Sequence, residues 1–259
     1  MSNKMLLEFK SKAQTLISLN SVVKSCKIVD LYSFQVGSWR KDFEKICYAI
    51  KTKFKDNLLI VRSSCLNEDN HEQSNAGAYL SIQNVSIDNI KSDIDKVISS
   101  YGTENPLDEV LIQPMLRQVR SSGVAFSHDP NTCSPYRVIN WSEGSDTSKV
   151  TAGLGGRVWI QSAKSKKYPS PKLKAILNII EELETLFGEF PLEFEFAFCG
   201  EETESKPWLL QVRPIILSKE SETVDQQADR LEIIAKKLDY QTSDHSSLLG
   251  RKTVYGVMP

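Results

Sequence analysis

The chain has 259 residues, 40% of them hydrophobic and 25% charged, which is a globular composition with enough length for one large domain or two lobes. Its 32 Lys and Arg residues balance 33 Asp and Glu residues, and the formal net charge of -1 argues against broad contact with nucleic acid. Five cysteines lack metal-ligand spacing, and no apolar run is long enough to cross a membrane. We therefore expect reduced thiols, no signal peptide, and a soluble protein in the cytoplasm.

Periodicity in the first half of the chain predicts three helices and three strands. Helices are expected at 6–17, 43–53 and 87–101, and strands at 57–61, 78–85 and 110–112. The run at 57–61 is apolar from Leu58 onward, as in a buried strand, and Arg62 follows it at the strand tip. Pro114 follows the last of these strands, and we expect pairing to change there because proline has no amide hydrogen to donate.

The second half of the chain predicts more strands than helices. Strands are expected at 123–127, 137–141, 158–161, 192–198 and 208–212, and helices at 173–187 and 222–238. Gly188 is a suitable stop for the helix that precedes it. The chain closes on the apolar, strand-like run 253–259, an unusual end for a complete protein, so we expect it to be a piece of a longer one.

The last two predicted strands are the most informative segment, because side chains alternate between the two faces of a strand. Glu193 and Glu195 share one face, and alternation on the partner strand adds Gln211 and Arg213 to it. The opposite, apolar face consists of Leu192, Phe194, Phe196 and Phe198 with Trp208, Leu210 and Val212. Carboxylate and amide oxygens suit Mg²⁺, and a guanidinium can hold phosphate oxygens. The same pattern also fits a solvated hairpin face.

Two further segments have residue types that suit a nucleotide. Arg62 precedes the small-residue turn 74–77, where Gly77 permits backbone amides to approach phosphates, although an ordinary strand exit has the same pattern. In the segment 113–116, apolar side chains could sandwich a flat ring while free backbone groups read its edge. A core strand with an edge proline is the alternative for that segment.

The remaining charged and titratable residues exclude several enzyme classes. His71, His128 and His245 stand in polar segments without a nucleophile signature or zinc-ligand spacing, and we expect all three on the surface. The basic run 164–174 is interpreted as a solvated loop rather than an anion site. The sequence therefore predicts neither a catalytic triad nor a zinc site.

Five blocks of the sequence carry a resemblance to a known family. They are SKAQTL at 11–16, VRSS at 61–64, SNAG at 74–77 continuing to Ser81, VLIQPM at 110–115 with SGVAF at 122–126 and DP at 129–130, and EFEFA at 193–197 with QVRP at 211–214. In this order they resemble the ATP-binding domain of the phosphoenolpyruvate synthase and pyruvate phosphate dikinase family, which has an ATP-grasp fold. The resemblance extends over about residues 5–216.

The resemblance implies a role for each matching residue. Lys12 and Arg62 contact the nucleotide phosphates, Gly77 and Ser81 belong to a lid over them, and Arg213 acts on the transferring phosphoryl group. Lys12, Arg62 and Arg213 are thus the implied catalytic residues. The other implied contacts are Gln113, Pro114 and Leu116 at the adenine ring, Glu193 near the ribose, and Glu195 and Gln211 as ligands of Mg²⁺.

Within the family, residues 141–147, 150–153 and 255–259 resemble most the branch that includes L-glutamine kinase of capsule phosphoramidate synthesis. Those enzymes combine an ATP-grasp domain with a swivelling phosphohistidine domain and an acceptor domain. No histidine of this chain matches the carrier, which implies a phosphohistidine domain elsewhere in the polypeptide or on a partner. The chain also departs from the family at Lys10–Ser11, where a glycine pair is frequent, and at Glu193, where Asp is common.

We predict an α+β, two-lobed ATP-grasp fold with the nucleotide between the lobes. Residues 1–110 form the N-terminal lobe, 111–216 the second lobe with the metal-binding hairpin, and 217–259 a helical tail. Our hypothesis is a Mg²⁺–ATP-binding domain of a dikinase-type phosphotransferase that passes a phosphoryl group to a phosphohistidine carrier and then to the L-glutamine amide. The alternatives are pyruvate as acceptor, a non-catalytic ATP-binding module, and an α+β interaction protein with a solvated hairpin.

Overall fold

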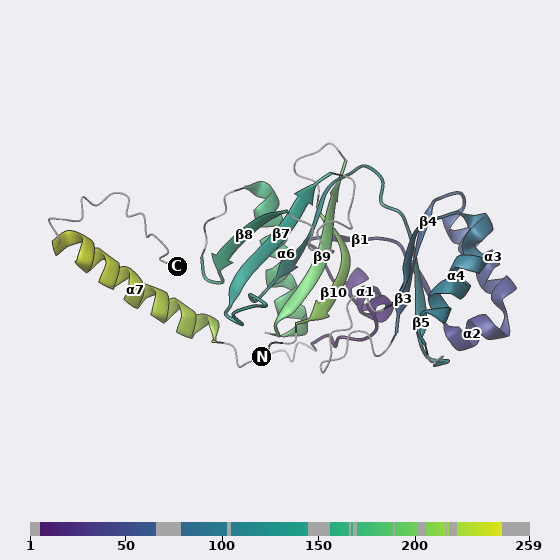
Figure 1. Ribbon diagram of the computed structural model, residues 1–259, viewed down its shortest axis with the longest axis horizontal. Helices are drawn as coiled ribbons and strands as arrows, with labels where there is room; N and C mark the ends of the chain where they lie inside the picture. Colours follow the sequence, from purple (N-terminus) through teal and green to yellow (C-terminus); the bar gives the residue numbers. More distant parts are fainter. Residues whose placement is uncertain are drawn as a thin grey trace.

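The computed structural model describes residues 6–65, 79–102, 105–144, 156–165, 167, 170–188, 190–200, 206–215, 217 and 222–244. These residues form two sheets with helices packed on each, which confirms the predicted α+β class with two sheet-based lobes (Figure 1). None of the described helices is both long enough and apolar enough to cross a membrane. The five cysteines all lie in described residues, and none of them forms a disulfide there.

The N-terminal lobe is built on an antiparallel four-stranded sheet with helices on one face (Figure 1). In spatial order its strands are β2 (Tyr32–Gln35), β5 (Glu109–Pro114), β3 (Leu59–Ser64) and β4 (Ser81–Val85), and its helices are α2 (Val36–Lys41), α3 (Phe43–Phe54), η1 (Ile87–Asn89) and α4 (Ile90–Ser99). Leu59, Val61 and Ile112 are fully buried in the core on the helix side. The residues between them point to the opposite face, toward the second lobe.

The second lobe contains a six-stranded sheet with one long helix on its apolar face. In spatial order its strands are β1 (Lys27–Ile28), β10 (Trp208–Pro214), β9 (Leu192–Cys199), β6 (Val119–Phe126), β7 (Tyr136–Glu143) and β8 (Arg157–Ser162), and the helix is α6 (Pro171–Phe187). Ile176 and Ile180 of α6 pack with Phe194 of β9 in one core. The helix ends at Gly188, as predicted, and the φ of 86° there lies in the region that favours glycine.

The two lobes exchange segments, because the start of the chain belongs to the second core. Helix α1 (Lys12–Asn20) contributes Ala13, Leu16 and Leu19 to that core, and β1 pairs in parallel with β10. Strand β5 lies in the N-terminal sheet, yet its Leu111 is also buried in the second core. A single boundary at residue 110 therefore does not separate the residues of the two sheets. Helix α1 and strand β1, which precede it, belong to the second lobe, and β5, which crosses it, belongs to the first sheet.

The first helix starts later than the sequence predicts. Residues 6–11 precede α1 in a non-helical conformation, in which Phe9 stacks on Phe187 at the end of α6. Leu7 and Phe9 of this segment pack against the second core, Leu6 is exposed, and Ser11 is the N-cap of α1. The sequence prediction also misses β2 and α2, which have only four and six residues and hence few periods to detect.

The last described helix, α7 (Val224–Asp244), projects from the second lobe in Figure 1. An ion pair between Lys164 and Asp225 ties its first turn to the turn after β8. Its later residues, such as Ile233 and Leu238, are exposed. The apolar run that closes the chain lies outside the described residues.

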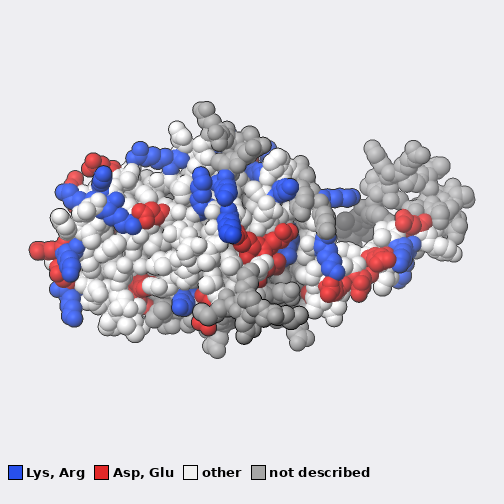
Figure 2. Space-filling model, turned by 180° about the vertical axis from the view of Figure 1, so that it is seen from behind, with Lys and Arg blue, Asp and Glu red and all other residues white. Residues whose placement is uncertain are grey.

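Charged side chains of both signs are interspersed over the face of the molecule seen in Figure 2. This mixture agrees with the formal net charge of -1. A protein that grips nucleic acid would present Lys and Arg gathered on one face. That nucleic acid is not a partner remains a prediction from charge.

Candidate functional site

Strands β9 and β10 bring four polar side chains to one face of the second sheet. Gln211 lies directly opposite Glu195, and Arg213 lies opposite Glu193, with which it forms an ion pair. Directly opposed residues of an antiparallel pair point to the same face, so all four side chains share it. Phe194 and the other aromatic residues of β9 point into the core, as alternation predicts.

A β-bulge in β10 changes the apolar row that strict alternation predicts. The register shifts between Leu209 and Gln211, so that Leu209 is fully buried in the core and the predicted core residue Leu210 is not. Trp208 lies opposite Ala197, on the polar face, which corrects its predicted place in the core. The bulged residue has no partner in the register, and its carbonyl is available to a group from outside the sheet.

Arg62 of the N-terminal lobe reaches across to this polar face. Its Nη1 donates to the Leu210 carbonyl at 3.3 Å, and its Nη2 donates to Gln211 Oε1 at 2.9 Å and to Glu195 Oε2 at 3.4 Å. The Arg62 side chain is 14% exposed, and its Nε is buried without a hydrogen-bond partner. A predicted phosphate-binding arginine and the two predicted metal ligands therefore meet between the lobes.

The alternation of β3 directs Arg62 toward the second lobe. Val61 is buried in the N-terminal core, which turns the next side chain to the opposite face of the sheet. Ser81 on β4 and Leu111 on β5 are the cross-strand neighbours of Arg62 on that face. Ser81 is exposed, whereas Gly77 and the rest of the predicted lid before residue 79 lie outside the described residues.

Lys12 is the first residue of α1, and a buried carboxylate from the N-terminal lobe holds this end of the helix. Glu109 accepts hydrogen bonds from Ser11 Oγ at 2.5 Å and from Gln14 Nε2 at 2.7 Å. Lys12 is 8% exposed and Glu109 is 7% exposed. Negative charge is favourable at a helix N-terminus, so Glu109 fixes the position of α1 between the lobes. Glu109 was not predicted as a site residue. The only feature of the sequence that could have indicated it is that an acidic residue directly precedes an apolar strand.

The segment that leaves β5 contains the predicted adenine-binding residues. Pro114 is the last residue of β5, and the Met115 amide still donates to the Leu58 carbonyl just before β3. The bonding to this partner segment therefore continues one residue past the proline, where the sequence predicts a change. Leu116 is half-buried. Gln113 is buried on the same face of the sheet as Arg62, and its Nε2 has no hydrogen-bond partner. This amide is a donor that a ligand between the lobes could use.

The open face of the second sheet changes from polar to apolar away from β10. Two rows of cross-strand partners cross it, one from Glu195 through Val124 and Asn140 to Val158, the other from Glu193 through Phe126 and Val138 to Ile160. On the edge strand β8, Val158 and Ile160 are 59% and 56% exposed. The polar site therefore continues into an apolar surface of the kind that contacts a ligand or another domain.

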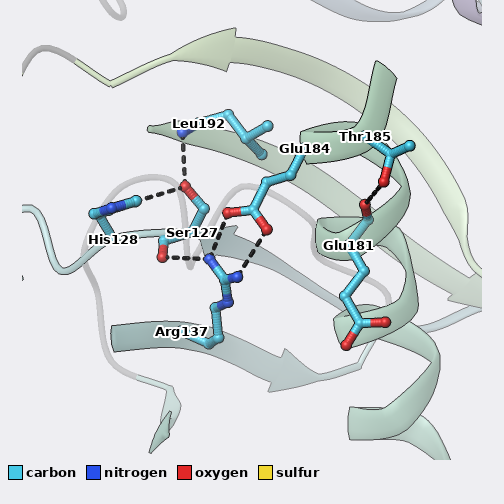
Figure 3. A network of polar contacts seen from close by, with 7 residues as sticks. All are labelled: Ser127, His128, Arg137, Glu181, Glu184, Thr185 and Leu192. Carbon is cyan, nitrogen blue, oxygen red and sulfur yellow. Dashed lines mark hydrogen bonds and ion pairs between the residues drawn. The ribbon is translucent and has the colours of Figure 1, made fainter. Parts of the chain in front are cut away.

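A second arginine–glutamate network anchors the start of β9 (Figure 3). Arg137 donates to both carboxylate oxygens of Glu184 on α6, at 2.6 and 2.7 Å, and to the Ser127 carbonyl at 2.8 Å. Ser127 Oγ accepts a hydrogen bond from the Leu192 amide at 2.8 Å and lies 3.1 Å from His128 Nδ1. The network holds β9 one residue before the first carboxylate of the polar face.

His128 is buried, which corrects the prediction that all three histidines lie on the surface. It is 8% exposed, and burial together with the nearby Arg137 charge lowers the pKa of His128 to about 4. The imidazole is therefore neutral at pH 7. The preceding residue Ser127 is buried with it, whereas Asn131 and Thr132 further along the same turn are exposed. His71 and His245 lie outside the described residues.

Glu195 and Gln211 fit a metal ion that shares its coordination with a ligand. No group of three or more His, Cys, Asp and Glu side chains among the described residues could hold an ion by itself. Glu195 Oε2 and Gln211 Oε1 nevertheless bond the same positively charged atom, Arg62 Nη2, so they converge on a cation. Mg²⁺ at nucleotides typically takes one or two protein ligands and completes its shell with phosphate and water oxygens.

Comparison with protein-family models matches residues 37–108 to the family described as pyruvate phosphate dikinase, AMP/ATP-binding domain. The matched segment extends from α2 to the residue before β5 and includes Arg62, so it supports an ATP-binding domain. It does not include β9 or β10. No curated protein sequence matches the chain significantly.

Several solved structures are similar to the chain at low sequence identity. The D-alanine-D-alanine ligase from Helicobacter pylori is 14% identical, with a TM-score of 0.45 over 88% of this chain and 60% of the ligase. The corresponding ligase from Coxiella burnetii is 11% identical, with a TM-score of 0.42 over 89% of this chain and 60% of the ligase. The protein PH1788 from Pyrococcus horikoshii Ot3 is 12% identical, with a TM-score of 0.47 over 80% of this chain and 90% of that protein. The chain thus spans 60% of the length of either ligase.

Proposed function

We propose that the chain is the Mg²⁺–ATP-binding domain of a dikinase-type phosphotransferase with an ATP-grasp fold. The observation that carries the proposal is the contact of Arg62 with Glu195 and Gln211 across the two lobes. The family match supports it independently, because residues 37–108 contain Arg62 and match an AMP/ATP-binding domain. The unpartnered Nε2 of Gln113 supports it further as a buried donor without a protein acceptor.

The proposed roles at the phosphates follow from charge. Arg62, Arg213 and Lys12 bind phosphate oxygens and offset the negative charge that builds up in phosphoryl transfer. Glu195 and Gln211 hold Mg²⁺, which when bound neutralises further charge on the phosphates. Positioning and electrostatic stabilisation account for most of the catalysis of such transfers, so this domain needs no nucleophile of its own.

The proposed base contacts come from the end of β5, and the proposed ribose contact is Glu193, the ion-pair partner of Arg213. Pro114 and Leu116 read the adenine edge through backbone groups, since the β5 register ends at Pro114 and Leu116 lies beyond it. Gln113 donates its free amide to the same ligand, and Glu193 lies near the ribose. Ser81, exposed beside Arg62, belongs to the lid over the phosphates.

The proposed acceptor is a histidine on a swivelling domain, in the rest of the polypeptide or on a partner, and after it the amide of L-glutamine. His128 is unsuited to be the carrier because it is buried against Ser127. The choice of L-glutamine over pyruvate rests only on the resemblance of residues 141–147, 150–153 and 255–259. The apolar rows beside the carboxylates offer contact area for a carrier domain.

We also propose a cytoplasmic location, where ATP is available and thiols stay reduced.

Thermal unfolding of the chain, titrated with ATP in the presence and absence of Mg²⁺, tests the binding step. At 100 times its dissociation constant, a ligand adds about 2.7 kcal/mol to the free energy of unfolding. We expect a saturable rise in the unfolding temperature that requires Mg²⁺. Absence of any shift at millimolar ATP would contradict nucleotide binding.

Transfer is tested separately by adding a phosphohistidine carrier domain in trans with ATP labelled at the β-phosphate. We expect label on the carrier histidine together with release of AMP and phosphate. A chain that binds ATP and yet labels no carrier would support the alternative, a non-catalytic ATP-binding module.

A further inference from the structure

We propose that Arg62 makes the Glu195–Gln211 site selective for a divalent cation that arrives with a nucleotide, because the guanidinium holds this site when no nucleotide is present. The inference rests on the proposed function and adds to it the residue that excludes the free ion. It follows from the atoms that share the site and from the bonds that Arg62 makes and leaves unmade.

The guanidinium and a metal ion need the same oxygens. Arg62 Nη2 is 2.9 Å from Gln211 Oε1 and 3.4 Å from Glu195 Oε2, and it is the only atom that the described residues show bonded to both. Mg²⁺ needs oxygen ligands at about 2.1 Å and strongly repels a positive group at contact distance. The guanidinium must therefore leave before an ion can be coordinated by both side chains.

A third contact makes departure of Arg62 unfavourable without a replacement partner. Its Nη1 donates to the Leu210 carbonyl, which the β-bulge of β10 leaves outside the ladder. The Arg62 side chain is mostly buried, so a guanidinium that loses these acceptors keeps an unpaired charge in a place of low dielectric. A free divalent ion offers Arg62 no new acceptor and adds a second positive charge beside it.

A nucleotide changes this balance because its phosphates offer Arg62 new acceptors. The buried Nε of Arg62 has no partner in the present arrangement. A phosphate can accept from Nε and one Nη together, the paired geometry that guanidinium groups favour. Arg62 then gains a bond it now lacks, while the ion that accompanies the nucleotide takes Glu195 and Gln211. The exchange is favourable only when the metal and the phosphates enter together.

The neighbouring arginine does not occupy the proposed metal site as Arg62 does. Arg213 is paired with Glu193 one row away, and Glu195 faces Val124 on its other side. Among the residues that the structure describes, Arg62 is thus the cation in contact with both proposed metal ligands, and a change at Arg62 isolates the effect.

Binding of Mn²⁺, followed by its electron paramagnetic resonance signal, tests the inference on the full chain, with and without ATP. We expect Arg62→Gln to bind free Mn²⁺ about tenfold more tightly than the wild type, the scale of one lost charge-assisted contact, and to bind Mn²⁺–ATP about tenfold more weakly. Arg117→Gln removes the same charge from an exposed site that bonds Asn57 and should match the wild type in both assays. Adding Glu195→Gln to Arg62→Gln should abolish the gain in Mn²⁺ affinity.

The outcomes separate this inference from the proposed function. Equal affinity of wild type and Arg62→Gln for free Mn²⁺, with ATP still bound by the wild type, overturns the inference alone. Persistence of the gain after Glu195→Gln also overturns it, because the ion then binds elsewhere. A wild type that binds no Mn²⁺–ATP overturns both. If Arg62→Gln fails to fold, Arg62→Lys replaces it in the test. One ammonium cannot keep all three contacts of the guanidinium, so the affinity for free Mn²⁺ should rise about threefold.

Discussion

Two arginine–glutamate contacts in this molecule differ in how completely their hydrogen bonds are satisfied. Arg137 and Glu184 lie within the second lobe, pair through bonds of 2.6 and 2.7 Å, and have the Ser127 carbonyl as a further acceptor. Arg62 and Glu195 come from different lobes, are 3.4 Å apart, and leave Arg62 Nε without a partner. The exposed fractions are 9% and 18% for the first pair, against 14% and 29% for the second.

The comparison separates residues that hold the fold from residues that can accept a ligand. A buried pair held by several short hydrogen bonds gains little from a further partner and loses much when one member is removed. A partly buried pair with a spare donor gains when an anion and a cation replace its mutual contact. The same two residue types thus differ in role because of their surroundings.

The largest expected effect is on the first pair. Glu184→Ala leaves the Arg137 charge buried without its partner and should lower the free energy of unfolding by about 3 to 5 kcal/mol. Denaturant unfolding monitored by circular dichroism measures this loss. ATP affinity per folded molecule should stay at the wild-type value. If Glu184→Ala lowered the ATP affinity and left the stability unchanged, the two pairs would not differ in role as proposed.

The second pair should show the reverse behaviour. Glu195→Ala and Arg213→Ala are expected to weaken Mg²⁺–ATP binding by about 2 to 3 kcal/mol, since each removes a charged group from the site. The free energy of unfolding without ligand should fall by only about 1 to 2 kcal/mol, because both side chains face away from the core and the charges left behind are more exposed than Arg137. Calorimetric titration measures the binding free energy of Mg²⁺–ATP, and denaturant unfolding measures the free energy of unfolding. Variants that unfold while binding per folded molecule is unchanged would mean that the faces are misassigned.

The network of the first pair also predicts a pH dependence. The folded protein holds His128 neutral down to about pH 4, whereas the ordinary histidine pKa is 6.5, so between these values the unfolded chain binds more protons. The free energy of unfolding should therefore fall as the pH drops from 6.5 toward 4, by roughly 1 to 2 kcal/mol after allowance for solvent screening. His128→Gln should remove this contribution. Parallel pH profiles of the two proteins would contradict a buried, neutral His128.

The smallest expected effect is that of Arg62 on stability alone. Arg62→Lys keeps the charge and loses the fork of donors, so the free energy of unfolding should change by less than about 1 kcal/mol. Thermal unfolding without nucleotide measures it. A loss above about 2 kcal/mol would place Arg62 with Arg137 among the residues that hold the fold.

Local alternation was sufficient to predict the polar face of β9 and β10. A side chain on a strand must point to one side or the other, and the aromatic residues of β9 identify the buried side without knowledge of any partner. The same argument failed one strand away. The bulge at Leu210 depends on how β10 pairs with β9, which alternation along one strand does not reveal. Because of the bulge, Leu209 lies in the core in place of the predicted Leu210.

The sequence by itself determined the α+β class, most of the helices and strands, and the side of the hairpin on which Glu193, Glu195, Gln211 and Arg213 lie. Only the tertiary structure decided which distant residues meet: Glu109 at the start of α1, His128 under its polar neighbours, and Arg62 against the Leu210 carbonyl. The physical reason is one of range. Strand and helix periods act between residues a few positions apart, whereas burial and ion pairing depend on surfaces that exist only after the lobes have packed.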